Sequence, residues 1–283
     1  MPTRHSPTLP QRRLARELRS LREATGLTVS EAAPKLYFSP SKLSRIETAQ
    51  VGVSMQDVEN MLKYYEVGGQ RREILLRVAR AAQQKKAWWH DYGDVSNVWT
   101  FLSYEDEATT IRSFEALVVP GLLQTEDYAR AMITKFVPGL LPNEIERHVE
   151  VRMARQLRLT AANPPTLWVI LDEAVLRRLV GSRYVMRRQL RRLIAAADMP
   201  NVRCQVLRFD AGEHVGLTGA FTIFSYLDPA DTDVVFFEHT AGEVYLDSPD
   251  EVSQHVCQFE SLGAVALPPR DSAALLNALA KKW

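Results

Sequence analysis

Apolar residues recur at every third or fourth position through the first third of the chain, which is the spacing of an amphipathic helix. Five such segments follow one another, separated by residues that begin or end helices. Thr28 and Glu31 form a capping box before the second segment, and Ser39 stands before the third, with Pro40 at the first helical position. The pattern predicts an all-α domain of five helices over residues 11–86. Residues 1–10 contain three prolines and predict a disordered tail.

The pattern changes after residue 86. Short apolar runs predict strands, and capped segments with helical spacing predict helices between them. The expected strands lie within residues 110–123, 166–171, 202–209, 220–226, 234–238 and 243–246. The expected helices cover residues 125–134, 143–157, 172–181, 183–197, 248–262 and 272–281. We therefore expect a C-terminal α+β domain over residues 87–283, joined to the first domain by an aromatic-rich segment, Trp88–Gly93.

The composition narrows the class of protein. Of the 283 residues, 46% are hydrophobic and 24% are charged, which is the balance of a soluble globular protein. No apolar run is long enough to predict a membrane span, and the first residues lack the apolar core of a signal peptide. The two cysteines have no metal-binding spacing and are expected to be buried thiols in a reducing compartment. We expect a cytoplasmic protein with no cofactor and no metal.

The net charge of +1 conceals an asymmetry. Residues 1–90 contain 16 Lys and Arg against 8 Asp and Glu, a charge of +8, whereas residues 91–283 contain 19 against 26, a charge of −7. A basic domain is attracted to a polyanion, and an acidic domain is repelled by one. The two domains are therefore expected to bind different partners.

The third helix, from Ser39 to Glu47, carries the most specific chemistry. Two serines, Lys42 and Arg45 share its open face, and a helix with such a face fits the major groove of DNA. Lys42 in the first turn opposes the helix dipole at a cost of about 0.3–1 kcal/mol, so an external phosphate explains it better than stability does. Arg45 suits a bidentate contact to guanine. An ordinary solvated helix face is the alternative.

Three stretches of the N-terminal domain resemble the helix-turn-helix domains of Xre-type, phage-repressor-like regulators: Leu27–Thr28, Ser39–Glu47 and Val53–Ser54. This resemblance covers residues 11–80 and implies sequence-specific binding of double-stranded DNA by a homodimer. Carried over to this sequence, it places Leu43 and Ile46 in the core. It assigns DNA contacts to Ser39, Pro40, Ser41, Lys42, Ser44 and Arg45.

Several positions depart from that family pattern. Pro34 falls within the second helix, where an interior proline usually kinks the helix. Tyr37 occupies the tight turn, where glycine is commoner because the backbone often needs a positive φ. Val29 and the stretch Ala49–Val51 stand where relatives often have polar or basic residues. These changes predict weaker phosphate contacts than relatives make.

Landmarks in the rest of the chain resemble one family of actinobacterial Xre-type regulators. They are Trp88–Asp94, Leu117–Arg130, Leu167–Glu173 and Pro200–Val202. Members have a large C-terminal domain of poorly defined role, often described as antitoxin-like, and are typically encoded beside a very small partner protein. The resemblance implies an antitoxin-like transcriptional regulator whose C-terminal domain binds that small neighbour-encoded protein.

Two charge blocks within the C-terminal domain indicate where a partner protein would bind. Residues 144–192 contain 11 basic and 5 acidic residues, and residues 205–260 contain 1 basic and 11 acidic residues. Four arginines lie along one predicted helix and are candidates for contact with an acidic protein: Arg187, Arg188, Arg191 and Arg192. The alternative is that the two blocks face each other or solvent.

A glycine-rich loop, Gly212–Gly219, leaves a second interpretation open. Its glycines allow the backbone to approach a ligand closely, which favours a one-component regulator that senses a small molecule. Catalytic signatures are weak: Ser39–Lys42 spells the S-x-x-K of serine acyl-enzymes without the accompanying motifs. Glu238 and His239 are adjacent on an expected strand and point to opposite faces. We expect a non-enzymatic protein with no catalytic or metal-binding residues.

Overall fold

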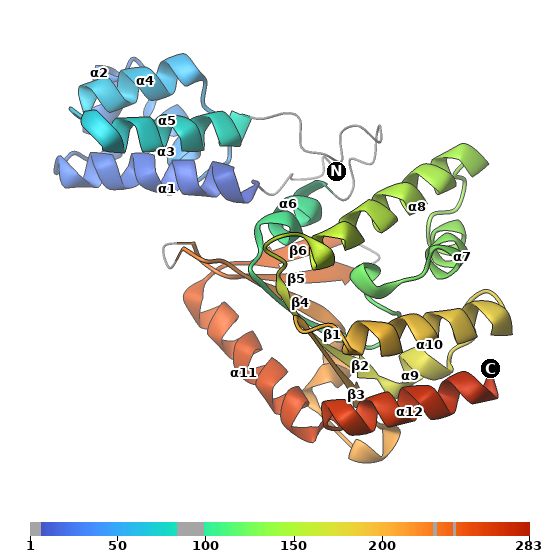
Figure 1. Ribbon diagram of the computed structural model, residues 1–283. Helices are drawn as coiled ribbons and strands as arrows, with labels where there is room; N and C mark the ends of the chain where they lie inside the picture. The colour runs from blue at the N-terminus through green and yellow to red at the C-terminus, as the bar shows by residue number, and fades with distance from the viewer. Residues whose placement is uncertain (1–6, 84–98, 229–230, 240–241) are drawn as a thin grey trace. The chain divides into compact units, whose positions relative to one another are not determined.

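A computed structural model describes residues 7–83, 99–228, 231–239 and 242–283. The chain forms two compact units, and the boundary between them falls within helix α6 (Trp99–Glu107), between Tyr104 and Glu105 (Figure 1). The aromatic-rich segment Trp88–Gly93, predicted as the junction between domains, lies outside the described residues.

Five helices build the N-terminal unit, as the sequence pattern predicted. They are α1 (Leu9–Ala24), α2 (Val29–Lys35), α3 (Pro40–Glu47), α4 (Met55–Tyr64) and α5 (Gly69–Gln83). The side chains of Thr28, Ser39 and Ser54 each accept a hydrogen bond from the backbone N–H three residues further on, which satisfies a donor at the start of α2, α3 and α4. The apolar stripes of all five helices meet in one core, which includes Leu18, Leu43, Val58, Met61 and Leu75.

The first helix begins earlier than its apolar pattern predicted. Leu9 is its first residue and is 2% exposed, and the backbone N–H of Thr8 donates to Oε1 of Gln11 at 3.0 Å. Pro10 is compatible with this start because the first helical N–H groups have no partner inside the helix. The predicted tail of residues 1–10 was therefore too long, since its last residues belong to α1.

A mixed sheet of six strands forms the centre of the C-terminal unit, so the mixed α and β class was predicted correctly. In sheet order the strands are β3 (Val202–Leu207), β2 (Thr166–Asp172), β1 (Thr110–Glu115), β4 (Phe221–Ser225), β5 (Val234–His239) and β6 (Gly242–Leu246). The first three are parallel to one another, and each step from β1 to β4, β5 and β6 is antiparallel. The helices are α7 (Glu126–Phe136), α8 (Pro142–Gln156), α9 (Glu173–Arg177), α10 (Arg183–Ala197), α11 (Pro249–Val265) and α12 (Pro269–Lys282).

Helices cover both faces of this sheet. In Figure 1, α11 lies along one side of the strands, and α8 and α10 lie on the other side. Phe259 of α11 packs edge-on against Trp168 of β2, with ring centroids 5.0 Å apart, within a core that includes Phe114, Ile170 and Phe221. The parallel strands are therefore largely buried on both faces, as their apolar runs require, whereas β6 at the sheet edge is mostly exposed.

The loop from Val119 to Thr125, between β1 and α7, is held by side-chain amides from three places. Gln189 of α10 accepts from the N–H of Thr125 at 2.7 Å and donates to the carbonyl of Leu123 at 2.8 Å. Gln156 of α8 donates to the carbonyl of Gln124 at 2.7 Å, and the Gln124 side chain donates to the carbonyl of Val119 at 2.7 Å. The longest landmark motif of the sequence thus contains a loop that glutamines fix in place.

Three details differ from expectation. Helix α6 was missed because its apolar residues do not form one stripe, and its three acidic residues are successive. The extended stretch predicted for residues 110–123 is a strand only as far as Glu115 and ends in a short 3-10 turn at Gly121–Leu123. Cys204 is buried, and burial raises the pKa of its thiol to about 12, but Cys257 is exposed, so the expectation of two buried thiols was wrong.

Candidate nucleic-acid interface

Helix α3 presents a polar face to solvent and an apolar face to the core. Its start is fixed because Ser39 Oγ accepts from the backbone N–H of Lys42 at 3.1 Å. Leu43 and Ile46 are buried, at 0% and 2% exposure, as predicted. All six predicted contact residues are exposed: Ser39, Pro40, Ser41, Lys42, Ser44 and Arg45. Their geometry suits a major groove, and their contact with DNA stays a prediction.

Lys42 has partners within the protein. Its ammonium lies 3.4 Å from Oδ2 of Asp57, on α4, and 4.0 Å from the centre of the Phe38 ring. These contacts offset the unfavourable position of a cation in the first turn of a helix. The sequence argument that an external anion explains Lys42 better than stability does was therefore incomplete. The Lys42 side chain remains 47% exposed and can still reach a phosphate.

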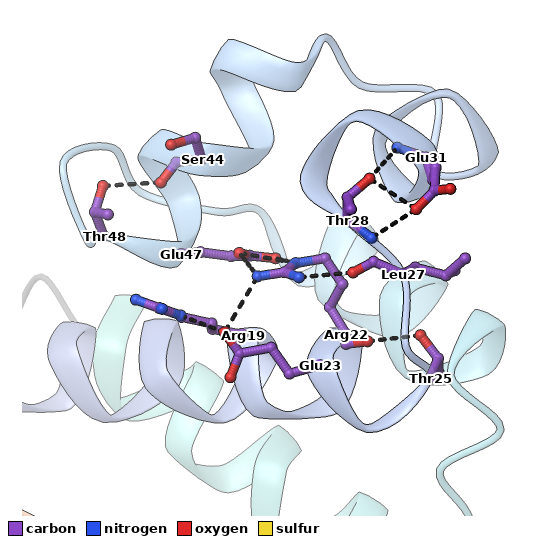
Figure 2. A network of polar contacts seen from close by, with 10 residues as sticks. All are labelled: Arg19, Arg22, Glu23, Thr25, Leu27, Thr28, Glu31, Ser44, Glu47 and Thr48. Atoms are coloured by element: carbon purple, nitrogen blue, oxygen red, sulfur yellow. Dashed lines mark hydrogen bonds and ion pairs between the residues drawn. The ribbon is translucent and has the colours of Figure 1, made fainter.

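A buried ion pair fixes α3 against α1 (Figure 2). The guanidinium of Arg22, on α1, donates from Nε to Oε1 of Glu47 at 2.8 Å and from a terminal nitrogen to Oε2 at 2.9 Å. Arg22 is 8% exposed and Glu47 is 7% exposed. The hydrogen bond to Glu47 is the main reason that the pKa of Arg22 is raised above its usual value. Two parallel hydrogen bonds between planar groups fix orientation as well as distance, so this pair sets the angle of α3.

The same arginine also reaches the start of α2. Another terminal nitrogen of Arg22 donates to the carbonyl of Leu27 at 2.7 Å, as Figure 2 shows. The next residue, Thr28, begins α2, where its N–H and hydroxyl donate to Glu31 Oε2 at 2.8 and 2.7 Å. Arg22 therefore connects α1, the start of α2 and the end of α3, which are the parts that position a helix-turn-helix.

The sequence reasoning missed the Arg22–Glu47 pair although a signal was present. Arg22 follows Leu14 and Leu18 at intervals of four along α1, and Glu47 lies four residues after Leu43. Each charge therefore continues an apolar stripe. Two opposite charges within the apolar stripes of neighbouring helices are expected to be buried together, because an unpaired buried charge is costly.

Two of the positions that depart from the family pattern lie at the end of α2 and in the turn that follows it. Pro34 lies inside α2, in its last turn, one residue before the helix ends at Lys35, and is exposed. Tyr37 has φ 58°, the left-handed conformation that favours glycine. A non-glycine residue in this conformation costs on the order of 1–2 kcal/mol. Tyrosine at this position is therefore not explained by the stability of the turn.

The four arginines predicted to bind a partner lie on α10 but do not share one environment. Arg188 pairs with Asp127 of α7, and Arg192 donates to Gln156 Oε1 of α8 at 3.3 Å. Arg187 and Arg191 are exposed, and within the described part of the chain neither has an ion-pair partner. Arg183, one turn earlier, is also exposed. The side chains free to meet a partner therefore form a row at intervals of four residues: Arg183, Arg187 and Arg191.

A second polar cluster lies on the side of the sheet opposite α11. Glu115, the last residue of β1, accepts from Ser113 Oγ at 2.7 Å, and burial raises the pKa of Glu115 to about 7. Arg152 of α8 donates to Gln124 Oε1 at 3.0 Å, and burial lowers the pKa of Arg152 to about 10. Both side chains are half-buried, and among the described residues neither is in an ion pair. Two incompletely paired, desolvated charges are the kind of feature that a bound ligand completes.

The remaining sequence candidates are placed as follows. The glycine-rich loop forms a 3-10 turn at Val215–Thr218, where Gly216 lies so close to the Phe114 ring that a Cβ would approach it to 2.4 Å. The glycine there serves packing against β1. In the described ranges, no three His, Cys, Asp or Glu side chains gather in a way that could hold a metal ion. Over the same ranges, no helix combines the length and apolar character needed to span a membrane.

Comparisons with known sequences agree with this division of the chain. Residues 13–75 match the family described as a helix-turn-helix domain, and residues 98–278 match the family described as a domain of unknown function, DUF5753. No curated protein and no solved structure matches the chain. The second match covers more than half of the chain. The protein therefore belongs to the DUF5753 family, with a helix-turn-helix DNA-binding domain in front of the domain that defines the family.

Proposed function

We propose that this protein is a sequence-specific transcriptional regulator that reads double-stranded DNA through α3. The observation that carries the proposal is the exposed polar face of α3, held at a defined angle by the buried Arg22–Glu47 pair. The match to helix-turn-helix domains supports DNA binding by this unit. The excess of basic residues over residues 1–90 supplies the attraction to phosphates.

The residues of α3 divide into two kinds of contact. Arg45 lies one turn beyond Ser41, on the same exposed face, and its guanidinium suits O6 and N7 of a guanine. Ser41 and Ser44 offer hydroxyls to base edges, whereas Ser39, Pro40 and Lys42 lie at the helix start, where a phosphate approaches. A helix of eight residues is about 12 Å long and reads only part of a typical operator. We therefore propose that a homodimer binds two half-sites of a pseudo-palindrome.

Replacement of Arg45 by alanine is expected to weaken binding to the operator by about 1–3 kcal/mol, roughly 5- to 150-fold, and to relax specificity at one base pair. The measurement is a mobility-shift titration of the full chain on the DNA upstream of its own gene, compared with a scrambled duplex. Arg77→Ala is the matched control, because Arg77 is an exposed arginine on α5. Equal affinities for Arg45→Ala and Arg77→Ala on the operator would contradict the assignment.

For the C-terminal domain we propose docking of a small acidic protein encoded beside the gene, in a cytoplasmic, antitoxin-like system. The row of exposed arginines on α10 supports this proposal, because it offers three positive charges that no internal ion pair satisfies within the described ranges. If docking changes the affinity for DNA, the DNA must change the affinity for the partner by the same factor.

A second candidate is a one-component regulator that senses a small molecule. The half-buried pair of Glu115 and Arg152 favours it, because a carboxylate-bearing ligand would give Arg152 the anionic partner that Gln124 does not supply. Glu115 and the hydroxyl of Ser113 would then face the rest of that ligand.

The two candidates are separated by one pair of variants. The charge reversal Arg187→Glu with Arg191→Glu is expected to abolish co-purification with the small neighbour-encoded protein, at least a tenfold loss of affinity, because like charges then meet. Arg152→Gln leaves that surface unchanged and serves as the control. If the α10 variant retains the partner, this surface is not the docking site. If metabolite carboxylates raise the melting temperature of the wild type but not of Arg152→Gln, the sensor is supported instead.

A further inference from the structure

Tyr37 is the most exposed of the large apolar side chains in the described part of the chain, at 96%. It occupies the turn between the two helices of the helix-turn-helix, two residues before Ser39. Its N–H donates to the carbonyl of Pro34 at 3.1 Å, and the N–H of Phe38 donates to the carbonyl of Ala33 at 2.9 Å. These two bonds are the helix-ending motif in which glycine normally supplies the left-handed residue.

Two other helices of the same unit end in the same way. Ala49 after α3 has φ 55°, and Glu66 after α4 has φ 55°, each with the same pair of backbone hydrogen bonds. At the end of α1, by contrast, the left-handed residue is a glycine, Gly26, with φ 72°. The fold therefore requires left-handed backbone at Tyr37, Ala49 and Glu66, and at each of these sites the chain accepts a side chain that strains the backbone.

Tyr37 differs from Ala49 and Glu66 in what its side chain offers. An exposed aromatic ring is unfavourable in water, and at 96% exposure it gains no packing from the protein. Neither backbone preference nor burial explains a tyrosine here, so an external partner remains. The position identifies that partner, because α3 starts two residues later and is the helix that enters the groove in helix-turn-helix complexes.

We propose that Tyr37 binds the DNA backbone at the edge of the groove that α3 enters, with its phenol hydroxyl donating to a phosphate oxygen and its ring packed on the adjacent sugar. Tyrosine is among the side chains that make such backbone contacts, which position a protein on DNA without reading sequence. This inference rests on the proposed function of α3. It also gives the domain a backbone contact in a region where Val29 and Val51 provide no polar side chain.

The test uses the full chain and three variants: Tyr37→Gly, Tyr37→Phe and Glu66→Gly. Both glycine variants relieve the same backbone strain, so amide hydrogen exchange in the helix before each turn is expected to slow by roughly fivefold. Of the two glycine variants, only Tyr37→Gly is expected to weaken DNA binding, by at least about tenfold, the lower end of the value of a hydrogen bond to a charged group. Tyr37→Phe, which lacks the hydroxyl, is expected to show most of the same loss of DNA affinity.

Two features distinguish a backbone contact from other roles. The loss in Tyr37→Gly should be equal on the operator and on a scrambled duplex, and the slope of affinity against salt should be unchanged, because tyrosine is neutral and releases no counterion. Wild-type affinity in Tyr37→Gly, or a loss confined to the operator, would overturn the contact while leaving α3 recognition intact. A wild-type protein that binds no duplex would overturn the proposed function and this contact together.

Discussion

Replacement of Glu47 by alanine is expected to destabilise the N-terminal domain by about 3–5 kcal/mol, a large share of the stability of a small domain. The variant leaves Arg22 buried at 8% exposure without its two carboxylate hydrogen bonds, and only the exposed Glu23, 3.5 Å from a terminal nitrogen of Arg22, remains near its charge. Arginine stays protonated at any accessible pH, so the domain cannot avoid the cost by neutralising the side chain. Arg22 retains only the carbonyl of Leu27 as a buried acceptor.

The measurement is hydrogen exchange of amides in α1 and α3 within the full chain, which reports on this unit without requiring two-state unfolding of both domains. Glu23→Ala is the matched control, because Glu23 is an exposed glutamate that pairs with Arg19 and lies 3.5 Å from the same Arg22 guanidinium at the surface. It should have little effect. A combined Arg22→Met and Glu47→Leu variant should recover most of the loss, since apolar residues can replace a buried ion pair. Glu47→Ala behaving like Glu23→Ala would show that the pair is not energetically coupled to the fold.

Stability and DNA binding should separate in that double variant. It keeps α3 folded but replaces two directional hydrogen bonds with contacts that have no preferred angle. We therefore expect the loss of free energy of DNA binding in this double variant to exceed its loss of free energy of unfolding. The reason is that a recognition helix must present its side chains at a fixed angle to the groove.

The sequence predicted α3 well because the signals for it are local. Ser39 and Pro40 specify its start, and Leu43 and Ile46 specify its buried face, all within eight residues. The Arg22–Glu47 pair was missed because its partners are 25 residues apart, and helical spacing alone does not show which stripes meet. The strain at Tyr37 was anticipated only as a missing glycine, and its exposure required the structure.

In the C-terminal unit the strands were predicted but their order was not. Apolar runs identify each strand separately, whereas the central position of β1, between β2 and β4, depends on pairings about 55 and 110 residues away. The arginine cluster shows the same limit. Helical spacing placed the four arginines on α10, but Asp127 and Gln156, which engage Arg188 and Arg192, come from other helices.

Replacement of Gln189 by leucine is expected to destabilise the C-terminal domain by about 2–4 kcal/mol. Leucine is close in size to glutamine, so the variant tests hydrogen bonding more than volume. It leaves the carbonyl of Leu123 buried without its donor and the N–H of Thr125 without its acceptor. Each unsatisfied group costs about 1–3 kcal/mol, and the cost at Thr125 is at the lower end because that residue is half-buried.

The effect should spread along α7, because Thr125 is also the residue that begins this helix, where its hydroxyl accepts from the N–H of Tyr128. Hydrogen exchange in the full chain should therefore accelerate in residues 119–130 before it does in the sheet. Gln254→Leu is the control, since Gln254 is an exposed glutamine on α11. Acceleration limited to α10 would contradict this role of Gln189. It would show that the loss of stability arises within α10 and not in the loop that Gln189 holds. Acceleration in the loop would mean that the motif Leu117–Arg130 serves the geometry of a buried turn. The structural part of this domain would then be distinct from the exposed arginines of α10, which are free to bind.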